Sequence, residues 1–231
     1  MTFVGGEPLL DKDLVELIKY SKELGMTTML VSNGSMITDN FLESLKDHLD
    51  WVSLSIDSLI EENNNFIGRK CNCFKANRES YLKLIENIKK YNYRLKINTV
   101  VSRANISENI GNFINEVMPE RWKIFQVLKI EDVNEKEFEK FKVENSEFQN
   151  FIQRNIIPEL SNITVAEDND LMECSYYMIN PEGKMFDNYN GKMSFSDSLL
   201  NVDVLDALDQ LNISKNKFYA RGELYNWKKE F

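Results

Sequence analysis

The stretch Thr2-Phe3-Val4-Gly5-Gly6-Glu7-Pro8 opens the chain with a short apolar run, two glycines, a carboxylate and a proline. Thr2–Val4 has the composition of a strand stub. Apolar side chains then recur at helical spacing up to Leu24, with Asp11 as a candidate N-cap. The next apolar run, Thr27–Ser32, is typical of another strand. This opening therefore predicts a strand–helix–strand unit with a glycine-rich loop after its first strand.

The alternation of strands and helices continues along the chain. Further strands are predicted at Trp51–Ile56, Leu95–Val101 and Trp122–Ile130, and helices after Thr38 and over Lys75–Tyr91, Ser107–Val117 and Ser146–Ile157. Asn63-Asn64-Asn65 and the Glu- and Lys-rich stretch Glu131–Glu147 are expected in polar loops, the latter with a helix start. This order indicates right-handed βαβ units and a parallel sheet, open or curled into a barrel.

After Pro158 the pattern changes to short strands. These are Thr164–Ala166, Tyr176–Ile179 and Lys184–Phe186, the last two joined by turn residues, followed by a short helix over Asp203–Leu211. We therefore predict an α/β fold with a main unit over residues 1–158 and a C-terminal extension over residues 159–231 that covers the active site.

Composition narrows the classes of function. The 231 residues are 42% hydrophobic and carry a net charge of −9, with a pI near 4.9. Broad nucleic-acid binding depends on basic surface, so we expect no nucleic-acid partner. No apolar run approaches the roughly 18 residues of a membrane span, and three cysteines make no disulfide framework. We expect a cytoplasmic protein without a membrane span.

Three predicted strands have one polar face. Val52-Ser53-Leu54-Ser55-Ile56-Asp57 is polar at every second position, Lys96 and Asn98 share a face, and so do Arg121 and Lys123. The apolar faces must meet the helices, so the polar faces would line a lumen. Buried cations without partners are costly, so we expect an anion opposite them and infer a phosphate-bearing small molecule. An antiparallel sheet with one solvated face is the alternative, since it gives the same alternation.

Short stretches along essentially the whole chain match one family in order. They are Thr2-Phe3-Val4-Gly5-Gly6-Glu7-Pro8, Val31-Ser32-Asn33-Gly34-Ser35, Ser55-Ile56-Asp57-Ser58, Ile67-Gly68-Arg69, Lys96-Ile97-Asn98-Thr99-Val100, Arg121-Trp122-Lys123-Ile124-Phe125-Gln126, Ser175-Tyr176 and Arg221-Gly222. On these stretches the chain resembles the radical S-adenosylmethionine (radical SAM) superfamily, and more narrowly its viperin-like members.

The resemblance implies a partial (βα)6 barrel of the TIM type that lacks its first βα unit. It also implies that SAM contacts Gly5, Gly6, Glu7, Ser32, Asn33, Ser55 and Arg69, with the Gly-Gly-Glu-Pro loop at the SAM amino group and Arg69 at its carboxylate. Viperin-like enzymes convert CTP, UTP or GTP to 3′-deoxy-3′,4′-didehydro nucleotides, which are antiviral chain terminators. The implied substrate-binding residues are Lys96, Asn98, Arg121, Lys123 and Lys192, with Tyr176 as a catalytic residue near the ribose. An electron donor for the cluster is an implied partner.

The spacing of the cysteines differs from that of the superfamily. The superfamily holds a [4Fe–4S] cluster on a Cys-x3-Cys-x2-Cys loop, whereas this chain has Cys71-Asn72-Cys73 and a separate Cys174. We expect no metal ligands here, an N-terminal truncation, and no reductive cleavage of SAM by this chain alone. Two other functions stay open: a nucleotide-binding module without catalysis, and another radical SAM branch. The sequence does not select the nucleotide base.

Overall fold

Six parallel strands form the main sheet of the computed structural model, which describes residues 1–69, 74–222 and 226–227. The strands are β1 (Thr2–Phe3), β2 (Met29–Ser32), β3 (Trp51–Ser55), β4 (Arg94–Val101), β5 (Arg121–Gln126) and β6 (Thr164–Glu167). Each strand pairs with the one before it, in the order β1-β2-β3-β4-β5-β6. Because all five pairings are parallel, the alternative of an antiparallel sheet is wrong.

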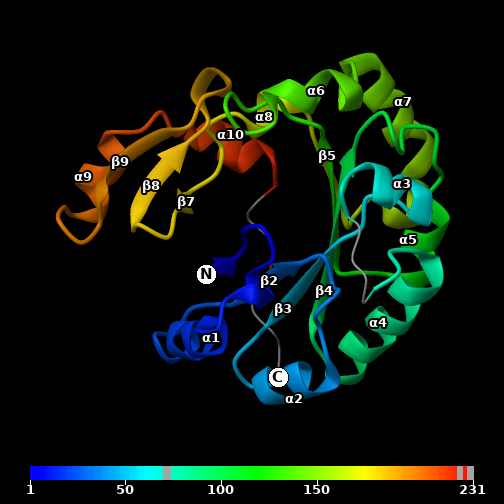
Figure 1. Ribbon diagram of the computed structural model, residues 1–231, viewed down its shortest axis with the longest axis horizontal. Helices are drawn as coiled ribbons and strands as arrows, with labels where there is room; N and C mark the ends of the chain where they lie inside the picture. The colour runs from blue at the N-terminus through cyan, green and yellow to red at the C-terminus, as the bar shows by residue number, and fades with distance from the viewer. Residues whose placement is uncertain (70–73, 223–225, 228–231) are drawn as a thin grey trace.

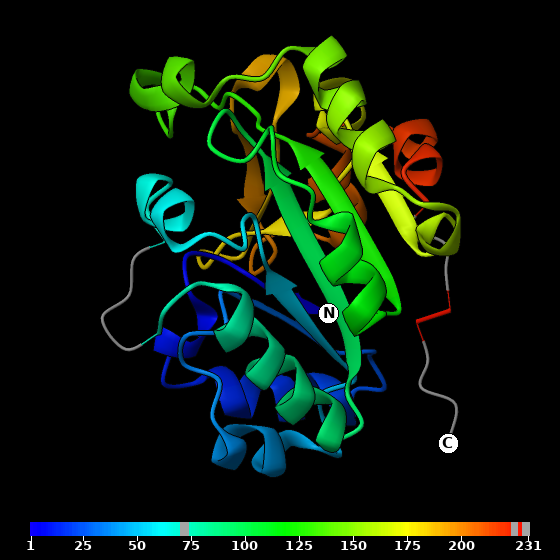
Figure 2. The same ribbon diagram turned by 90° about the vertical axis from the view of Figure 1, so that its right-hand side faces the viewer.

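Helices cover one face of this sheet (Figure 1). They include α1 (Leu14–Glu23), α2 (Asp39–Leu45), α4 (Arg78–Lys90), α5 (Gly111–Val117) and α7 (Asn145–Asn155). Figure 2 shows α4, α5 and α7 in front of β4 and β5. Sequential strand order with helices on one side is the winding of a TIM-type barrel, here open between its edge strands β1 and β6. The predicted α/β class is confirmed.

The hydrophobic core lies between the sheet and these helices. Leu54, Ile97 and Trp122 on the outer face of the sheet have no exposed surface, and Ile85 and Phe148 on the helices pack into the same cluster. We call the opposite face, turned away from these helices, the inner face. The apolar side chains of each strand are thus buried in the core, and the polar side chains of the same strands lie on the inner face.

Several predicted element boundaries are wrong. Helix α4 begins at Arg78 rather than Lys75, because the side chain of Asn77 accepts a hydrogen bond from the Ser80 amide and caps the helix there. Strand β5 ends at Gln126, because the next residues turn back through hydrogen bonds with Asn134. Helix α3 (Glu61–Phe66) occupies a stretch that was expected to be a polar loop, and α6 (Glu135–Phe141) lies in a stretch for which a loop and a helix start were expected.

The C-terminal part adds a small antiparallel sheet. Strands β7 (Met178–Ile179), β8 (Lys184–Asp187) and β9 (Ser194–Ser198) pair in that order, which confirms the predicted hairpin, and helices α8 (Asn169–Met172), α9 (Val204–Asp209) and α10 (Lys215–Ala220) accompany them. In Figure 1 this part lies across the main sheet from α4 and α5. Because β6 pairs with β5, the main sheet includes a strand from beyond residue 158, and a division of the chain there stays a prediction.

Membrane insertion finds no support in the helices. In residues 1–69, 74–222 and 226–227, no helix has both the length and the apolar character that a membrane crossing requires.

Candidate active site on the inner face of the sheet

Cationic side chains lie side by side on the inner face. The strand register pairs Lys96 with Arg121 and Asn98 with Lys123, and strand β3 adds Ser53 opposite Lys96 and Ser55 opposite Asn98. Paired positions in neighbouring strands share a face, so these side chains form two adjacent rows. Lys96 is 8% exposed, Arg121 7% and Lys123 1%. The structure therefore brings three buried cations together.

A carboxylate from the last strand of the sheet is part of this group. Glu167, with no exposed surface, forms an ion pair with the Lys123 ammonium and accepts a hydrogen bond from the Tyr176 hydroxyl. The Arg221 guanidinium lies 3.8 Å from the same carboxylate and 3.6 Å from the centre of the Tyr176 ring. Four segments of the chain thus meet at Glu167.

The C-terminal residues lie along the inner face. Arg121 donates to the carbonyl oxygen of Gly222. At the first residues of β4 and β3, Arg94 donates to the carbonyl of Asn226 and the Trp51 indole donates to that of Trp227. These contacts attach the end of the described chain to three strands of the sheet.

Polar atoms without partners mark the same face. Within the described residues, the Ser53 hydroxyl and the side-chain oxygen of Asn98 on this face are buried without a hydrogen-bond partner, and so is the Ser175 hydroxyl in the C-terminal part. Buried polar groups are normally satisfied, so these three atoms have hydrogen-bonding capacity for a bound molecule.

A second polar group gathers at the carboxyl ends of β1 and β2. The Glu7 carboxylate accepts hydrogen bonds from the Ser32 hydroxyl at 2.9 Å and the Asn33 amide at 3.0 Å. It also accepts a longer one, at 3.3 Å, from the Leu9 amide. The carboxylate is therefore fixed in place beside the Gly5-Gly6 turn. A Cβ atom built on Gly6 meets nothing within 4 Å, so the backbone there is open to an approaching ligand.

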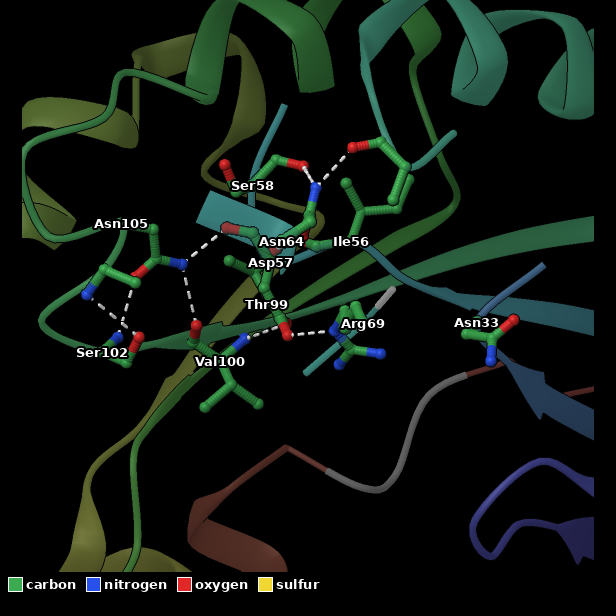
Figure 3. Close-up of polar contacts among 12 residues, drawn as sticks. Asn33, Ile56, Asp57, Ser58, Asn64, Arg69, Thr99, Val100, Ser102 and Asn105 are labelled. Carbon is green, nitrogen blue, oxygen red and sulfur yellow. Dashed lines mark hydrogen bonds and ion pairs between the residues drawn. The ribbon is translucent and has the colours of Figure 1, made fainter. Parts of the chain in front are cut away.

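Arg69 and Asp57 form the third polar group (Figure 3). The Asp57 carboxylate accepts from the Arg69 guanidinium and, at 2.8 Å, from the Val100 amide. Burial lowers the pKa of Arg69, but the charge of Asp57 and its hydrogen bond to the guanidinium, with smaller contributions from Tyr81 and Glu7, outweigh burial and raise that pKa above its usual value. Arg69 is therefore a fixed cation.

A hollow of about 360 Å³ adjoins this group. It is lined by Asp57, Ile67, Arg69, Val100, Ser102, Val127 and Phe141. Its wall combines apolar side chains with one ion pair, as small-molecule sites commonly do.

The polar groups of the described residues suit SAM but not a [4Fe–4S] cluster. SAM carries an ammonium and a carboxylate, and the fixed Glu7 carboxylate beside open glycine backbone, together with the Arg69 cation, suits those two charges. A cluster does not fit: the described residues contain no group of three or more Cys, His, Asp or Glu side chains able to hold a metal. Cys71 and Cys73 lie outside the described residues, and Cys174 is buried and free.

Lys192 stands apart from the inner-face cations. Its side chain is 66% exposed and pairs with Glu131 at 3.0 Å. Its expected role at a triphosphate stays a prediction.

Sequence reasoning did not assign a role to Glu167 or Arg221. Glu167 falls one residue beyond the predicted strand Thr164–Ala166, and extension of the period of two would have placed it on the inner face. Arg221 lies in a matched stretch, but no local pattern connects it to β6.

Comparisons with known proteins agree with this architecture. Residues 1–115 match the family model described as the radical SAM superfamily. Solved structures share the fold: a SAM-bound anSMEcpe structure (TM-score 0.64, 14% identity, 95% of this chain and 64% of that one) and Streptococcus suis SuiB bound to S-adenosylmethionine (TM-score 0.60, 15% identity, 95% and 55%). The fold is thus that of radical SAM enzymes, which use SAM and a [4Fe–4S] cluster.

Curated relatives narrow the class. A protein of Lacinutrix mariniflava is 45% identical over 98% of this chain and 47% of its own length, and one of Flammeovirga pacifica is 40% identical over 99% and 78%. A Danio rerio relative is 33% identical over 99% and 66%. All three are named S-adenosylmethionine-dependent nucleotide dehydratases. The chain belongs to this viperin-like family of radical SAM enzymes, although it spans about half the length of the Lacinutrix relative.

Proposed function

We propose that this chain binds SAM and a ribonucleoside triphosphate and serves the dehydration of CTP, UTP or GTP to the 3′-deoxy-3′,4′-didehydro nucleotide, an antiviral chain terminator. The observation that carries the proposal is the set of three buried cations on neighbouring strands, Lys96, Arg121 and Lys123. The names of the relatives support the reaction class.

The inner-face cations bind the triphosphate in this proposal. Polyphosphate oxygens accept charge-assisted hydrogen bonds from ammonium and guanidinium groups. The unsatisfied side-chain oxygen of Asn98 and the hydroxyl of Ser53 lie in the same rows. The Asn98 oxygen accepts a hydrogen bond from the nucleoside, and the Ser53 hydroxyl donates or accepts one. Lys192 provides a further phosphate contact in this proposal.

SAM binds at the carboxyl ends of the first strands. Glu7 receives its ammonium and Arg69 its carboxylate, while Gly5, Gly6, Ser32, Asn33 and Ser55 line the remaining contacts. In the family's reaction, SAM reduced by one electron from a [4Fe–4S] cluster would supply the radical that removes a hydrogen atom from the ribose. An electron donor is required for that step and is a proposed partner.

Tyr176 acts next to the ribose. Its hydroxyl proton is directed at the Glu167 carboxylate, and the Arg221 guanidinium stacks on its ring. Both contacts fix the orientation of the phenol. The phenol is therefore a rigid group at the edge of the cation cluster, suited to position the sugar.

Calorimetric titration tests the nucleotide part of this proposal. We expect CTP, UTP or GTP to bind, and Arg121→Met to weaken binding at least about 10-fold, since a buried charge contact is lost. The matched control is Arg78→Met on α4, whose exposed guanidinium pairs with Glu116 on the outer side. No heat and no thermal shift with any nucleotide would refute nucleotide binding.

A nucleotide-binding module without catalysis is the second candidate. The observation that favours it is the cysteine content, which provides no Cys-x3-Cys-x2-Cys motif. On either proposal this chain alone does not cleave SAM reductively. Anaerobic reconstitution with iron and sulfide, followed by chromatography for 5′-deoxyadenosine, tests this, and formation of 5′-deoxyadenosine would contradict it.

A further inference from the structure

Glu167 places a negative charge among the cations that a polyphosphate would use. Its side chain has no exposed surface, one oxygen pairs with the Lys123 ammonium, and the other accepts from Tyr176. Arg221, itself almost fully buried, lies 3.8 Å from the second oxygen. Both oxygens of the carboxylate are therefore engaged by groups that face the proposed substrate.

Such a carboxylate acts on an incoming anion in two ways. It fixes the position of Lys123 and the phenol, which favours binding by preorganisation. It also competes for the Lys123 and Arg221 charges and repels the ligand directly. Repulsion between buried charges is only weakly screened by salt, and it grows with the charge of the ligand.

We propose that Glu167 is a specificity-determining residue that lowers the affinity of the inner face for polyphosphate without an attached nucleoside. Phosphate groups alone then bind weakly, and contacts to the ribose and base decide which ligand is retained. This inference rests on the proposed nucleotide function, and its test is separable from the test of that function.

The test replaces the charge without changing the shape. Glu167→Gln keeps an acceptor for Tyr176 and removes the negative charge. We titrate the variant with inorganic phosphate, pyrophosphate and tripolyphosphate as probes. Tripolyphosphate is expected to bind at least about 5-fold more tightly than to the unaltered protein, and the gain is expected to increase from phosphate to tripolyphosphate.

Two further variants separate charge from structure. Glu167→Asp keeps the charge and is expected to retain the weak polyphosphate binding. Glu79→Gln removes a carboxylate from the exposed surface of α4, where it pairs with Lys83, and is expected to leave the titrations unchanged. Thermal unfolding of each variant reports whether it is folded.

The outcomes decide the proposal. A folded Glu167→Gln variant that binds all probes equally or more weakly than the unaltered protein overturns it, since the carboxylate would then serve only to hold Lys123. Absence of tripolyphosphate binding in both proteins overturns it as well. If polyphosphates behave as expected but nucleotides bind no better than tripolyphosphate, the effect of the Glu167 charge on polyphosphate affinity stands, whereas its role in specificity and the nucleotide function fail.

Discussion

Lys123 is the most buried of the three inner-face cations, and its ammonium lies 5.9 Å from the centre of the Tyr176 ring and 5.9 Å from that of the Phe125 ring. Burial of a lysine charge in such surroundings is costly unless a counter-charge lies close to it. Glu167 provides it from the neighbouring strand. The position of the charge on β5 is thus determined by a residue on β6.

Removal of the lysine charge should therefore weaken the fold. Lys123→Met leaves the Glu167 carboxylate buried without its ammonium and is expected to lower the free energy of unfolding by about 3–5 kcal/mol, measured by urea denaturation. Replacing both, in Lys123→Met with Glu167→Leu, is expected to recover much of that loss. Lys83→Met, which breaks an exposed pair, serves as the control and should not shift the urea midpoint.

At this scale the sequence predicts the cations but not their counter-ion. Lys96, Arg121 and Lys123 follow from an alternation of period two, which depends only on neighbouring residues. Glu167 lies 44 positions from Lys123, and no local pattern connects the two residues. The pairing of this carboxylate with Lys123 could be assigned only once the strand pairing was known.

Helices α5 and α7 are in close contact at Gly111. The side-chain oxygen of Asn155 accepts hydrogen bonds from the amides of Ile110 and Gly111, at 2.6 Å and 2.9 Å, and so caps the start of α5. A Cβ atom built on Gly111 would lie 2.1 Å from the Asn155 carbonyl oxygen. The contact has no room for a side chain.

Gly111→Ala should consequently push the two helices apart. We expect a loss of about 1–3 kcal/mol in the free energy of unfolding, by chemical denaturation followed by circular dichroism. Gly6→Ala is the matched control, because a Cβ there meets nothing within 4 Å and stability should be retained. Equal stability of the two variants would contradict the close packing.

Two tyrosines of the α4 region make stability depend on alkaline pH. Burial raises the pKa of the Tyr81 and Tyr93 phenols above the ordinary value. In the unfolded chain the two phenols ionise at about pH 10. Burial of the neutral phenols therefore contributes fully to stability below that pH, and this contribution is lost as the pH rises toward the phenol pKa values of the folded protein. Urea midpoints measured from pH 8 to 11 should fall at the alkaline end, and Tyr93→Phe should reduce that slope. A slope unchanged in the variant would argue against Tyr93 as a source.

The elements that sequence reasoning missed are held by tertiary contacts. Asn64 lies in α3, has no exposed surface, and donates through its side-chain amide to the carbonyls of Ser58 and Ala76. Asparagine has a weak intrinsic helix propensity, so three in succession indicate a loop until these contacts are known. The long amphipathic helices α1, α4 and α7 were predicted, because the spacing of their apolar residues along the sequence is itself helical.

For the molecule as a whole, the end of the described chain is attached to the start of two strands. The Arg94 guanidinium lies 4.1 Å from the centre of the Trp51 ring, and the Trp227 ring packs on Trp51 at 5.9 Å. Trp51 has no exposed surface as a result of this packing and its place in the sheet. The parallel arrangement of the strands was predictable from the alternation of strands and helices. The contact of the C-terminal residues with Trp51 and Arg94 was not.

Trp227→Ala should loosen that attachment. We expect a loss of about 1 kcal/mol in stability from the ring contact, and stronger acrylamide quenching of the remaining tryptophan fluorescence as Trp51 becomes accessible. Trp122 has no exposed surface and should not contribute to the change. Trp227→Phe retains a ring and should resemble the unaltered protein; equal quenching in the alanine variant would contradict the packing.

The strand order also sets a sequence of events during synthesis. A ribosome delivers β1 to β6 in the order in which they pair, so the sheet can extend as the nascent polypeptide emerges. The Trp51–Trp227 hydrogen bond, by contrast, joins residues 176 positions apart and forms only when translation has reached the last of them. This contact on the first residue of β3 therefore forms only after all six strands of the sheet have been synthesised.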